Sequence, residues 1–475
     1  MSRGIIVPQK KLNEECGIVG IKSMAKKQLA YDVYFGLFAL QHRGQESAGI
    51  AVNYDPRKIY YYKKMGLVND IFDEDILNAF PSGDCAIGHV RYSTTGSSNV
   101  VNAQPVVFYG RFGRMAVAHN GNIINCDMIK SALMKKGHLF QSSVDSEVIA
   151  ALINLYSEES LLDGVLKACA ELQGAFSLVI MADGKLVALR DRHGLRPLVI
   201  GKRGDEIIFA SETCALDALN AEFVRDVLPG EIVTVDENHN ISSTFMRNID
   251  KHLCVFEYVY LARSDSTIDG RSVYDTRYEC GKYLAELYKI DADVVAGVPD
   301  SAVVAARGYS EATGIPLVDA LSKNRYVGRT FIQPSQSLRE NGVRVKLNAI
   351  KNNIKGKRLV LIDDSIVRGT TSKKIIRLLR ESGAKEVHML IASPIVKYPC
   401  FFGVDMDTRE KLIGGYRNEK EICEMIEADS LHYLPIEYLI KASTGNRCDY
   451  CAACFDGKYP VDVDKYNCGK FVLEI

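Results

Sequence analysis

The stretch 358–372 reads RLVLIDDSIVRGTTS, and it constrains the possible folds more than any other part of the chain. It begins with an unbroken apolar run, residues 359–362, of the kind that forms strands buried on both faces of a parallel sheet. Two carboxylates, Asp363 and Asp364, follow at the carboxyl end of this strand, where open α/β sheets bind ligands. A helical pattern comes next and ends at Gly383, the expected C′ residue. The stretch therefore predicts a parallel α/β sheet with a ligand site at its edge.

The turn between this strand and this helix has the composition of a phosphate site. It consists of Arg368, Gly369, Thr370, Thr371 and Ser372. The backbone N–H groups that open a helix are unpaired, and with the positive end of the helix dipole they attract anions. The two carboxylates upstream can hold ribose hydroxyls directly or through Mg²⁺. The alternative is an ordinary strand-to-helix turn with solvated acids, but the carboxylates and the turn together favour a sugar-phosphate site.

The length and the charge of the chain narrow the classes of partner. A chain of 475 residues can form two or three domains, each with its own core. The formal net charge is zero, but residues 323–380 carry 15 Lys and Arg against three acids. Such an excess can bind nucleic acid, although this segment lacks interleaved aromatic residues and surrounds the phosphate turn. We therefore expect a polyphosphate ligand, and neither a nucleic-acid nor a membrane partner.

The cysteines bear on the compartment and on metal binding. No apolar run is long enough to span a bilayer, and the first fifteen residues have no apolar core of a secretory signal. Thirteen cysteines in such a chain favour reduced thiols or metal ligation over disulfides, so we expect a cytoplasmic protein. Cys448, Cys451 and Cys454 form a C-x₂-C-x₂-C pattern that suits zinc or an iron–sulfur cluster, and the spacing alone slightly favours zinc. Free thiols in a loop are the alternative.

Cys16 lies between two acids and the apolar segment GIVGI. A cysteine that enters a strand is most often a small buried hydrophobe. Cleavage between Glu15 and Cys16, however, would place a free α-amino group beside the thiol. With an ordinary pKa of about 7.7–8.0, this amine can accept the thiol proton near neutral pH. The segment therefore suits an N-terminal nucleophile, which requires no separate histidine base.

Four motifs follow Cys16: QHRGQE at 41–46, HVRYST at 89–94, HNGN at 119–122 and SVDSE at 143–147. Each resembles a motif of the class II glutaminase domain, which has the N-terminal nucleophile (Ntn) hydrolase fold. The resemblance implies that Cys16 attacks glutamine, which would be bound by Arg91, Thr94 and Asp145. It also implies an oxyanion hole made by the side chain of Asn120 and the backbone N–H of Gly121. Taken singly, these residues are also consistent with a surface base, a helix cap and a hairpin turn.

The second half resembles the phosphoribosyltransferases, since DDSIVRGTTS is similar to their motif for phosphoribosyl diphosphate (PRPP). Nearly the whole chain resembles the family of glutamine PRPP amidotransferases, in the branch with a cluster and a propeptide. The resemblance implies Mg²⁺ at Ser301, Asp363 and Asp364, although Ser301 is also a candidate helix cap. It implies that PRPP is bound by Lys323, Arg329, Asp363, Asp364, Arg368, Gly369, Thr370, Thr371 and Ser372. Residues 323–334 would include a loop that closes over PRPP, with a solvated loop as the alternative.

The resemblance also implies how the chain is organised and what it binds. We expect a propeptide (1–15), an α+β four-layer Ntn-hydrolase sandwich (16–250) and an α/β parallel-sheet type I phosphoribosyltransferase domain (251–475). Strand-like segments over 176–237 fit the two stacked antiparallel sheets of the first domain. The implied [4Fe–4S] ligands are Cys254, Cys400, Cys451 and Cys454, with Cys448 as a spare. Purine nucleotides would inhibit the enzyme, and it would be a homotetramer.

The implied activity is the synthesis of 5-phosphoribosylamine, diphosphate and glutamate from PRPP, glutamine and water, the first step of purine synthesis. Ammonia released at Cys16 would pass internally to the ribose. One alternative is another class II amidotransferase, which would share the first half but not DDSIVRGTTS. A second is a PRPP-binding regulator, which would need neither Cys16 nor the glutaminase motifs and would normally carry a DNA-binding segment.

Overall fold

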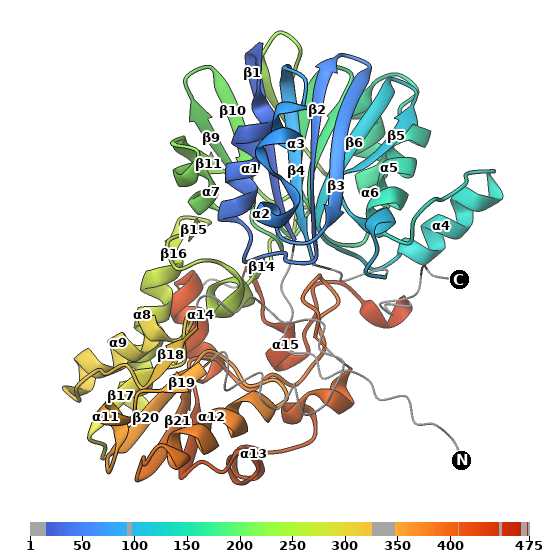
Figure 1. Cartoon of the computed structure of the whole chain (residues 1–475). Coiled ribbons are helices and arrows are strands. Elements are labelled where there is room, and N and C mark those ends of the chain that lie inside the picture. Colours follow the sequence, from blue (N-terminus) through green and yellow to red (C-terminus); the bar gives the residue numbers. More distant parts are fainter. Residues whose placement is uncertain are drawn as a thin grey trace, which may run out of the picture.

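The computed structural model describes residues 16–92, 97–324, 347–406, 408–445, 449–466 and 473. The chain forms two lobes that follow each other in sequence (Figure 1). The first lobe holds the strands from β1 to β13, and the second is built around a parallel sheet. The expected propeptide, together with Thr94, Arg329 and Cys448, lies outside the described residues. The expected domain boundaries near residues 15 and 250 stay a prediction.

The first lobe contains two antiparallel sheets that stack on each other. The seven-stranded sheet has the order β11 (Glu222–Asp226), β9 (Val199–Arg203), β10 (Glu206–Ala210), β1 (Gly17–Lys27), β4 (Gly83–Arg91), β2 (Ser47–Asp55), β3 (Lys58–Met65). The six-stranded sheet has the order β13 (Ile241–Phe245), β12 (Glu231–Val235), β8 (Lys185–Arg190), β7 (Gly174–Ala182), β6 (Gly113–Ile123), β5 (Val106–Gly110). Apolar side chains from both sheets, including Ile87, Val179 and Phe209, form the core between them.

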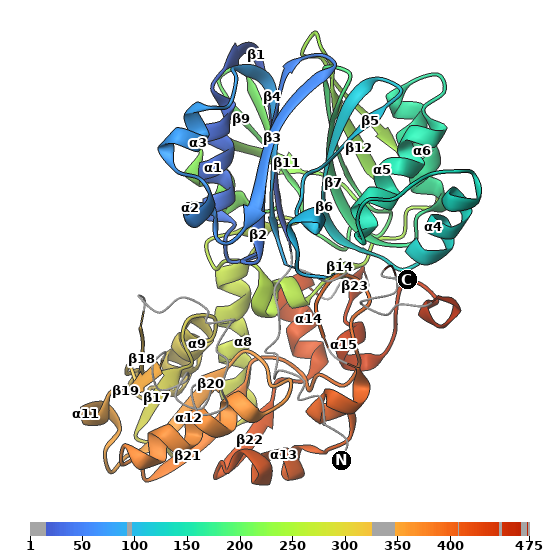
Figure 2. The ribbon, with the colours of Figure 1, turned by 45° about the vertical axis from the view of Figure 1, so that its right-hand side comes forward.

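Helices cover the outer face of each sheet, which gives four layers (Figure 2). The first sheet packs on α1 (Leu29–Ala39) and α7 (Thr213–Ala218), and α2 (Val68–Ile71) and α3 (Glu74–Asn78) extend this side. The second sheet packs on α4 (Cys126–Lys135), α5 (Asp145–Tyr156) and α6 (Leu161–Glu171). The central strand β7 is buried along its whole length because it has a sheet on one face and helices on the other. The predicted four-layer sandwich is confirmed.

The second lobe has a four-stranded parallel sheet in the order β17 (Val294–Gly297), β20 (Arg358–Asp363), β21 (Glu386–Ile391) and β22 (Ser430–Tyr433). The predicted parallel α/β sheet is confirmed, and the apolar run 359–362 lies fully buried inside β20. The surrounding helices are α8 (Val273–Leu287), α9 (Val303–Thr313), α11 (Lys351–Ile354), α12 (Thr370–Glu381), α13 (Glu419–Ile426), α14 (Ile436–Thr444) and α15 (Ala453–Asp456). Gly383 adopts φ +101° just beyond α12, as a C′ residue does.

Short elements join the two lobes. The π-helical turn η2 (Glu257–Leu261) is separated by two residues from the short strand β14 (Leu253–Cys254). That strand pairs in parallel with β23 (Tyr450–Cys451) from the C-terminal part of the chain. Two further ladders complete the lobe: β15 (Thr267–Ile268) with β16 (Arg271–Ser272), and β18 (Leu321–Lys323) with β19 (Leu347–Ala349). The junction is therefore made from segments almost 200 residues apart.

Candidate functional site

Cys16 lies immediately before β1 and is buried. Its thiol donates to the carbonyl of Tyr92, with 3.5 Å between Sγ and the oxygen. A Cβ on the next residue, Gly17, would lie 2.9 Å from Cγ2 of Val90, so only a glycine lets the strand start this close to β4. The structure thereby brings the predicted nucleophile beside the end of β4, where Arg91 lies.

The predicted oxyanion residues lie inside β6, in the middle of a sheet. Asn120 pairs with Ser177 of β7, so the hairpin-turn alternative is wrong. The Asn120 side chain is fully buried, and within the part of the chain that the structure describes neither its oxygen nor its nitrogen has a hydrogen-bond partner. A buried amide without partners is costly, and such groups often mark a ligand position. Gly121 has φ +146° and lies so close to the carbonyl of Ala175 that no side chain fits there.

His89 connects the first sheet with β6, the oxyanion strand, so called because it carries the predicted oxyanion residues Asn120 and Gly121. Its Nε2 lies 3.0 Å from the carbonyl oxygen of His119, the residue that precedes Asn120. Because β4 pairs with β1, this bond fixes the oxyanion strand relative to the start of β1, where Cys16 lies. Burial lowers the pKa of His89 to about 3, so the imidazole is neutral. A neutral ring donates from Nε2 and completes the connection between the two sheets.

Asp145 is the first residue of α5, and its side chain does not cap the helix. The helix cap is therefore not its role. One carboxylate oxygen accepts a hydrogen bond from the backbone N–H of Ile123 at 3.2 Å, and the other lies 3.4 Å from Nδ1 of His119. Burial alone would raise the pKa of Asp145, but His119 and the backbone donors lower it below its ordinary value. The group is thus an anion at neutral pH, as a partner for an ammonium group must be.

Arg91 is the last residue of β4, and only 2% of it is exposed, so it is not a surface base. Its Nη1 donates to Oε1 of Glu46 at 2.9 Å. The neighbouring segment is fixed by Asn102, whose amide donates to Oγ of Ser143 at 2.9 Å. Ser143 stands two residues before Asp145. Nη1 of Arg91 also lies 3.4 Å from the carbonyl oxygen of Ser97, to which the amide of Asn102 donates at 2.9 Å. Hydrogen bonds therefore connect Arg91 with the segment that leads into Asp145.

A buried ionic network, which the sequence analysis missed, lies beneath Cys16. The fully buried Arg43 donates from Nε to the carbonyl of Cys16 at 3.1 Å. Its other nitrogens bind two buried carboxylates, Glu212 at 2.6 Å and Glu257 at 2.8 Å. Burial alone would raise the pKa of Glu212, but His42 and Arg43 lower it well below the ordinary range. The QHRGQE motif contains Arg43, but its acidic partners Glu212 and Glu257 lie 169 and 214 residues further along the chain, and no sequence pattern connects them with Arg43.

The predicted PRPP residues gather at the carboxyl edge of the parallel sheet. Asp363 ends β20, and Asp364 accepts a hydrogen bond from the hydroxyl of Ser301. Ser301 is not a helix cap, because α9 begins at Val303 with Ala302 in the N-cap position. All three groups proposed to bind Mg²⁺ therefore meet where β17 and β20 end side by side.

The phosphate turn has the geometry that its sequence predicts. Gly369 occupies the N-cap position of α12 with φ +74°, in the left-handed region that favours glycine. No side chain caps this helix, so the first N–H groups of Thr370, Thr371 and Ser372 have no side-chain partner at the N-cap. Lys323 ends β18 and forms an ion pair with Asp300, which stands directly before Ser301. The turn, the carboxylates and Lys323 thus border the same edge.

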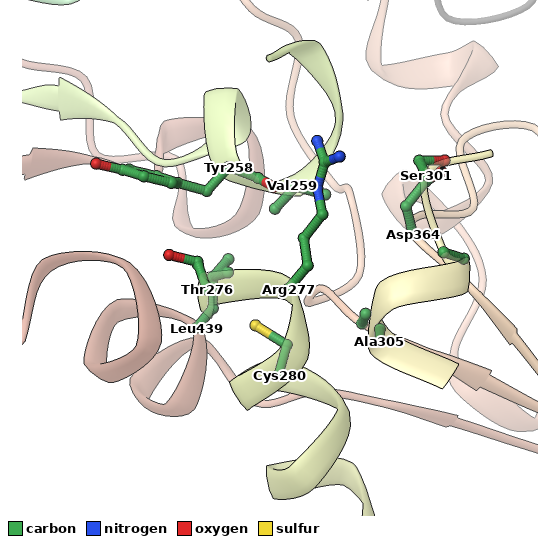
Figure 3. A pocket seen from close by; sticks show the side chains of 11 residues that line it. Tyr258, Val259, Thr276, Arg277, Cys280, Ser301, Ala305, Asp364 and Leu439 are labelled. Atoms are coloured by element: carbon green, nitrogen blue, oxygen red, sulfur yellow. Dashed lines mark hydrogen bonds between the residues drawn. The ribbon is translucent and has the colours of Figure 1, made fainter. Parts of the chain in front are cut away.

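A small pocket lies behind the carboxylates, between η2, α8 and the start of α9 (Figure 3). Arg277 projects from α8 toward η2, while Ser301 and Asp364 lie on the opposite side. Its guanidinium donates to the carbonyls of Tyr258 and Ala262, both at 2.8 Å. Burial lowers the pKa of Arg277 from its ordinary value, and Asp364 acts in the opposite direction. The same short turn η2 therefore contacts both the ionic network of Arg43 and the surroundings of the carboxylates that are predicted to bind PRPP.

The four cysteines predicted to hold a cluster line one cavity at the lobe junction. Cys254 and Cys451 are paired across β14 and β23, Cys454 lies in α15, and Cys400 precedes a turn. Burial raises the pKa of Cys451 to about 12. Burial and the three neighbouring sulfurs raise the pKa of Cys454 well above its ordinary value. Without a cation, these buried thiols stay protonated, because neighbouring thiolates would repel each other. A bound metal cation compensates the negative charge and displaces the protons, so the cavity is suited to a metal group.

The described helices include none that is both long and apolar enough to cross a membrane.

Comparison with known proteins matches both lobes. The family model of the glutamine amidotransferase domain matches residues 89–218, and that of the phosphoribosyl transferase domain matches residues 278–393. The chain is 48% identical over 467 residues to the amidophosphoribosyltransferase of Methanocaldococcus jannaschii, with 94% of this chain and 98% of that protein covered. The corresponding protein of Bacillus subtilis is 46% identical over 459 residues, with 96% of each chain covered.

Solved structures agree with these relatives. One is glutamine PRPP amidotransferase from B. subtilis complexed with ADP and GMP, with a TM-score of 0.88 and 44% identity, covering 94% of this chain and 98% of that one. Another is described as the allosteric regulatory enzyme of purine biosynthesis, with a TM-score of 0.89 and 45% identity, covering 94% of this chain and 97% of that one.

Proposed function

Because this chain belongs to the amidophosphoribosyltransferase family, we propose that it hydrolyses glutamine at Cys16 and uses the ammonia to convert PRPP into 5-phosphoribosylamine. It is a phosphoribosyltransferase enzyme of purine biosynthesis. Glutamine, PRPP and water would give 5-phosphoribosylamine, diphosphate and glutamate. One observation carries the proposal: a single chain combines two sets of groups. The first is a buried thiol beside β4 together with a buried amide in β6 that has no hydrogen-bond partner among the described residues, and the second is an uncapped helix start beside two carboxylates.

The glutaminase half would work as an N-terminal nucleophile site. Removal of residues 1–15 would free the α-amino group of Cys16, which then takes the proton of the thiol as it attacks the side-chain amide of glutamine. Arg91 would hold the substrate carboxylate and Asp145 its ammonium group, and Thr94 would line the same site. Asn120 and the N–H of Gly121 would stabilise the tetrahedral oxyanion, and collapse of this intermediate releases ammonia and leaves a thioester for water.

The transferase half would hold PRPP by its phosphates and ribose. The N–H groups that open α12 would bind the 5-phosphate, and Asp363 and Asp364 the ribose hydroxyls. Lys323 and Arg329 would contact the diphosphate. A loop beyond Lys323 would close over PRPP and exclude water from the ribosyl cation until ammonia arrives from the other half.

Two cofactors fit the residues present. Mg²⁺ prefers oxygen ligands, and Ser301, Asp363 and Asp364 offer them together; the ion would neutralise the leaving diphosphate. The four-cysteine cavity would hold a [4Fe–4S] cluster. A zinc ion bound at about 2.3 Å would draw its sulfurs to roughly 3.8 Å from each other. Among the described residues, no three cysteine sulfurs lie within 4.8 Å of one another, which favours the larger group.

The proposal also covers how the enzyme is inhibited, how many subunits it has and where in the cell it is found. The similar B. subtilis structure is complexed with ADP and GMP, and we propose that purine nucleotides also inhibit this enzyme. We further propose a homotetramer and a cytoplasmic location.

The decisive variant is Cys16→Ala. We expect it to abolish PRPP-dependent glutamate release and glutamine-dependent synthesis, while synthesis from free ammonia continues, because the variant removes only the nucleophile. Mass spectrometry of the mature wild-type protein should show Cys16 as the first residue. Loss of both activities, or of neither, would contradict the assignment.

The same measurements separate the two rivals. Another class II amidotransferase would release glutamate without consuming PRPP. A PRPP-binding regulator would bind PRPP, with no turnover of glutamine or ammonia.

A further inference from the structure

A turn from the second lobe lies against the oxyanion strand of the first. Residues 400–403 lie in the connection between β21 and β22 of the parallel sheet, yet Gly403 contacts Gly121 of β6. A Cβ on Gly403 would lie 3.3 Å from both the Cα and the carbonyl carbon of Gly121, closer than the backbone allows without moving. Gly403 also has φ +116°, a conformation that side chains rarely adopt. Close approach and backbone conformation therefore both require glycine here.

Two side chains of the first lobe hold this turn against β6. The amide of Asn122, one residue after Gly121, donates to the carbonyl of Phe401 at 2.9 Å. Arg196 donates to the carbonyl of Phe402 from Nε at 3.0 Å and from Nη2 at 2.6 Å. Arg196 is fully buried, and Oε1 of Glu257 lies 3.3 Å from its Nη1, which balances its charge. A buried guanidinium that is paired in this way fixes its carbonyl partner firmly.

The far end of the turn is anchored in the cysteine cavity. The backbone N–H of Phe402 lies 3.4 Å from Sγ of Cys400, one of the four cavity cysteines. The Phe402 ring is buried in a cluster with Ile124, Ala175 and Leu195 of the first lobe. The turn is thus fixed at one end by the second lobe and pressed at the other against the backbone whose N–H stabilises the oxyanion.

We propose that Gly403 and Arg196 are positioning residues for the glutaminase reaction. They keep the turn 400–403 packed against β6 at Gly121, and this contact keeps the backbone N–H of Gly121 in place. The inference rests on the proposed glutaminase function. It adds that the geometry of the glutaminase site in the first lobe depends on a turn from the second lobe. An oxyanion donor contributes about 10²–10³ in kcat, and a misplacement of about 1 Å can cost about 10². Movement by a few tenths of an ångström should therefore be measurable.

The test is Gly403→Ala, which pushes a methyl group against Gly121. We expect the kcat for glutamine hydrolysis to fall about tenfold, with the KM for glutamine changed less than about twofold, because the oxyanion donors act only in the transition state. Synthesis from free ammonia should stay within about twofold of wild type. The matched control is Gly314→Ala, where φ is +76° but no atom lies within 4 Å of the added methyl, and it should change neither activity.

Asn122→Asp provides an independent arm, which decides the matter if Gly403→Ala does not fold. It removes the amide donor and places a carboxylate near the carbonyl of Phe401, so the same selective loss of glutaminase kcat is expected. Equal loss of both activities, a change confined to KM, or wild-type glutaminase kcat in both variants would overturn the inference. Failure of the wild-type protein to hydrolyse glutamine would instead overturn the proposed function.

Discussion

At the scale of single residues, the glutaminase site is defined by polar groups buried at a cost. His89 and Asn120 are both 0% exposed in the middle of the sandwich. The imidazole of His89 is neutral and bridges the two sheets. The amide of Asn120 has no hydrogen-bond partner among the described residues, as expected for a group proposed to bind the substrate. Such groups are maintained only where the surrounding fold is stable enough to hold them.

The neutral state of His89 predicts an acid-sensitive fold. Its folded pKa of about 3 lies below the ordinary 6.5, so the folded state binds fewer protons than the unfolded chain. Its contribution to stability is therefore complete above pH 6.5 and is lost as the pH falls toward 3, by up to about 1.4 kcal/mol per pH unit. We expect His89→Gln, which keeps a donor, to reduce this loss, and denaturant midpoints at pH 7 and pH 4.5 measure it. Identical pH dependence in both proteins would contradict the role.

At the scale of elements, the proposed PRPP site depends on how α12 begins. A left-handed glycine turns the chain from the carboxylates into the helix, which leaves the first N–H groups pointing out of an uncapped end. The helix is held in place by Ile375, Ile376 and Leu379, which are buried against the sheet core. Strand, turn and helix are contiguous in sequence, so local residues set almost the whole geometry of this site.

The variant Gly369→Ala tests this element. An alanine at φ +74° is strained by about 1–2 kcal/mol, and relief of the strain reorients the N–H groups at the start of α12. We expect the KM for PRPP to rise about tenfold in the ammonia-dependent assay. Gly383→Ala, at φ +101° beyond the other end of the same helix, is the control. It should lower stability and leave the KM for PRPP unchanged, and an equal rise in both variants would refute the assignment.

At the scale of the whole molecule, a few buried charges connect the two halves. Glu257, in η2, binds Arg43 at 2.8 Å and Arg196 at 3.3 Å, and all three side chains are fully buried. Arg43 also holds the carbonyl of Cys16, while Arg277 holds the carbonyl of Tyr258 in the same turn. The position of the halves relative to each other is therefore fixed next to both sites.

Glu257→Gln should uncouple the halves. It leaves two buried guanidinium groups with Glu212 as the remaining carboxylate of this network, and removing one partner of a buried ion pair costs about 3–5 kcal/mol. We expect a lower denaturant midpoint and separate unfolding of the two lobes. The control Glu279→Gln breaks a half-exposed pair with Arg271 and should cost less than about 1 kcal/mol. Indistinguishable unfolding of the two variants would show that the network does not join the lobes.

The sequence by itself determined the elements and sites whose parts are neighbours in the chain. The buried run 359–362, the carboxylates after it and the turn into α12 lie where the pattern predicts, because periodicity and turn residues act locally. The family resemblance added expected roles for residues such as Arg91 and Asp145. In the fold, hydrogen bonds made by Asn102 connect Arg91 with the segment that leads into Asp145.

Only the tertiary structure decided what depends on contacts across long separations. Asn120-Gly121 could equally have formed a hairpin turn, and pairing with β7 placed it inside a strand. No periodic pattern in the sequence predicts the partners of Arg43 or the contact of Gly403 with Gly121. Buried charges and close backbone contacts gain their energy from burial and geometry, and the chain acquires both only when distant segments meet.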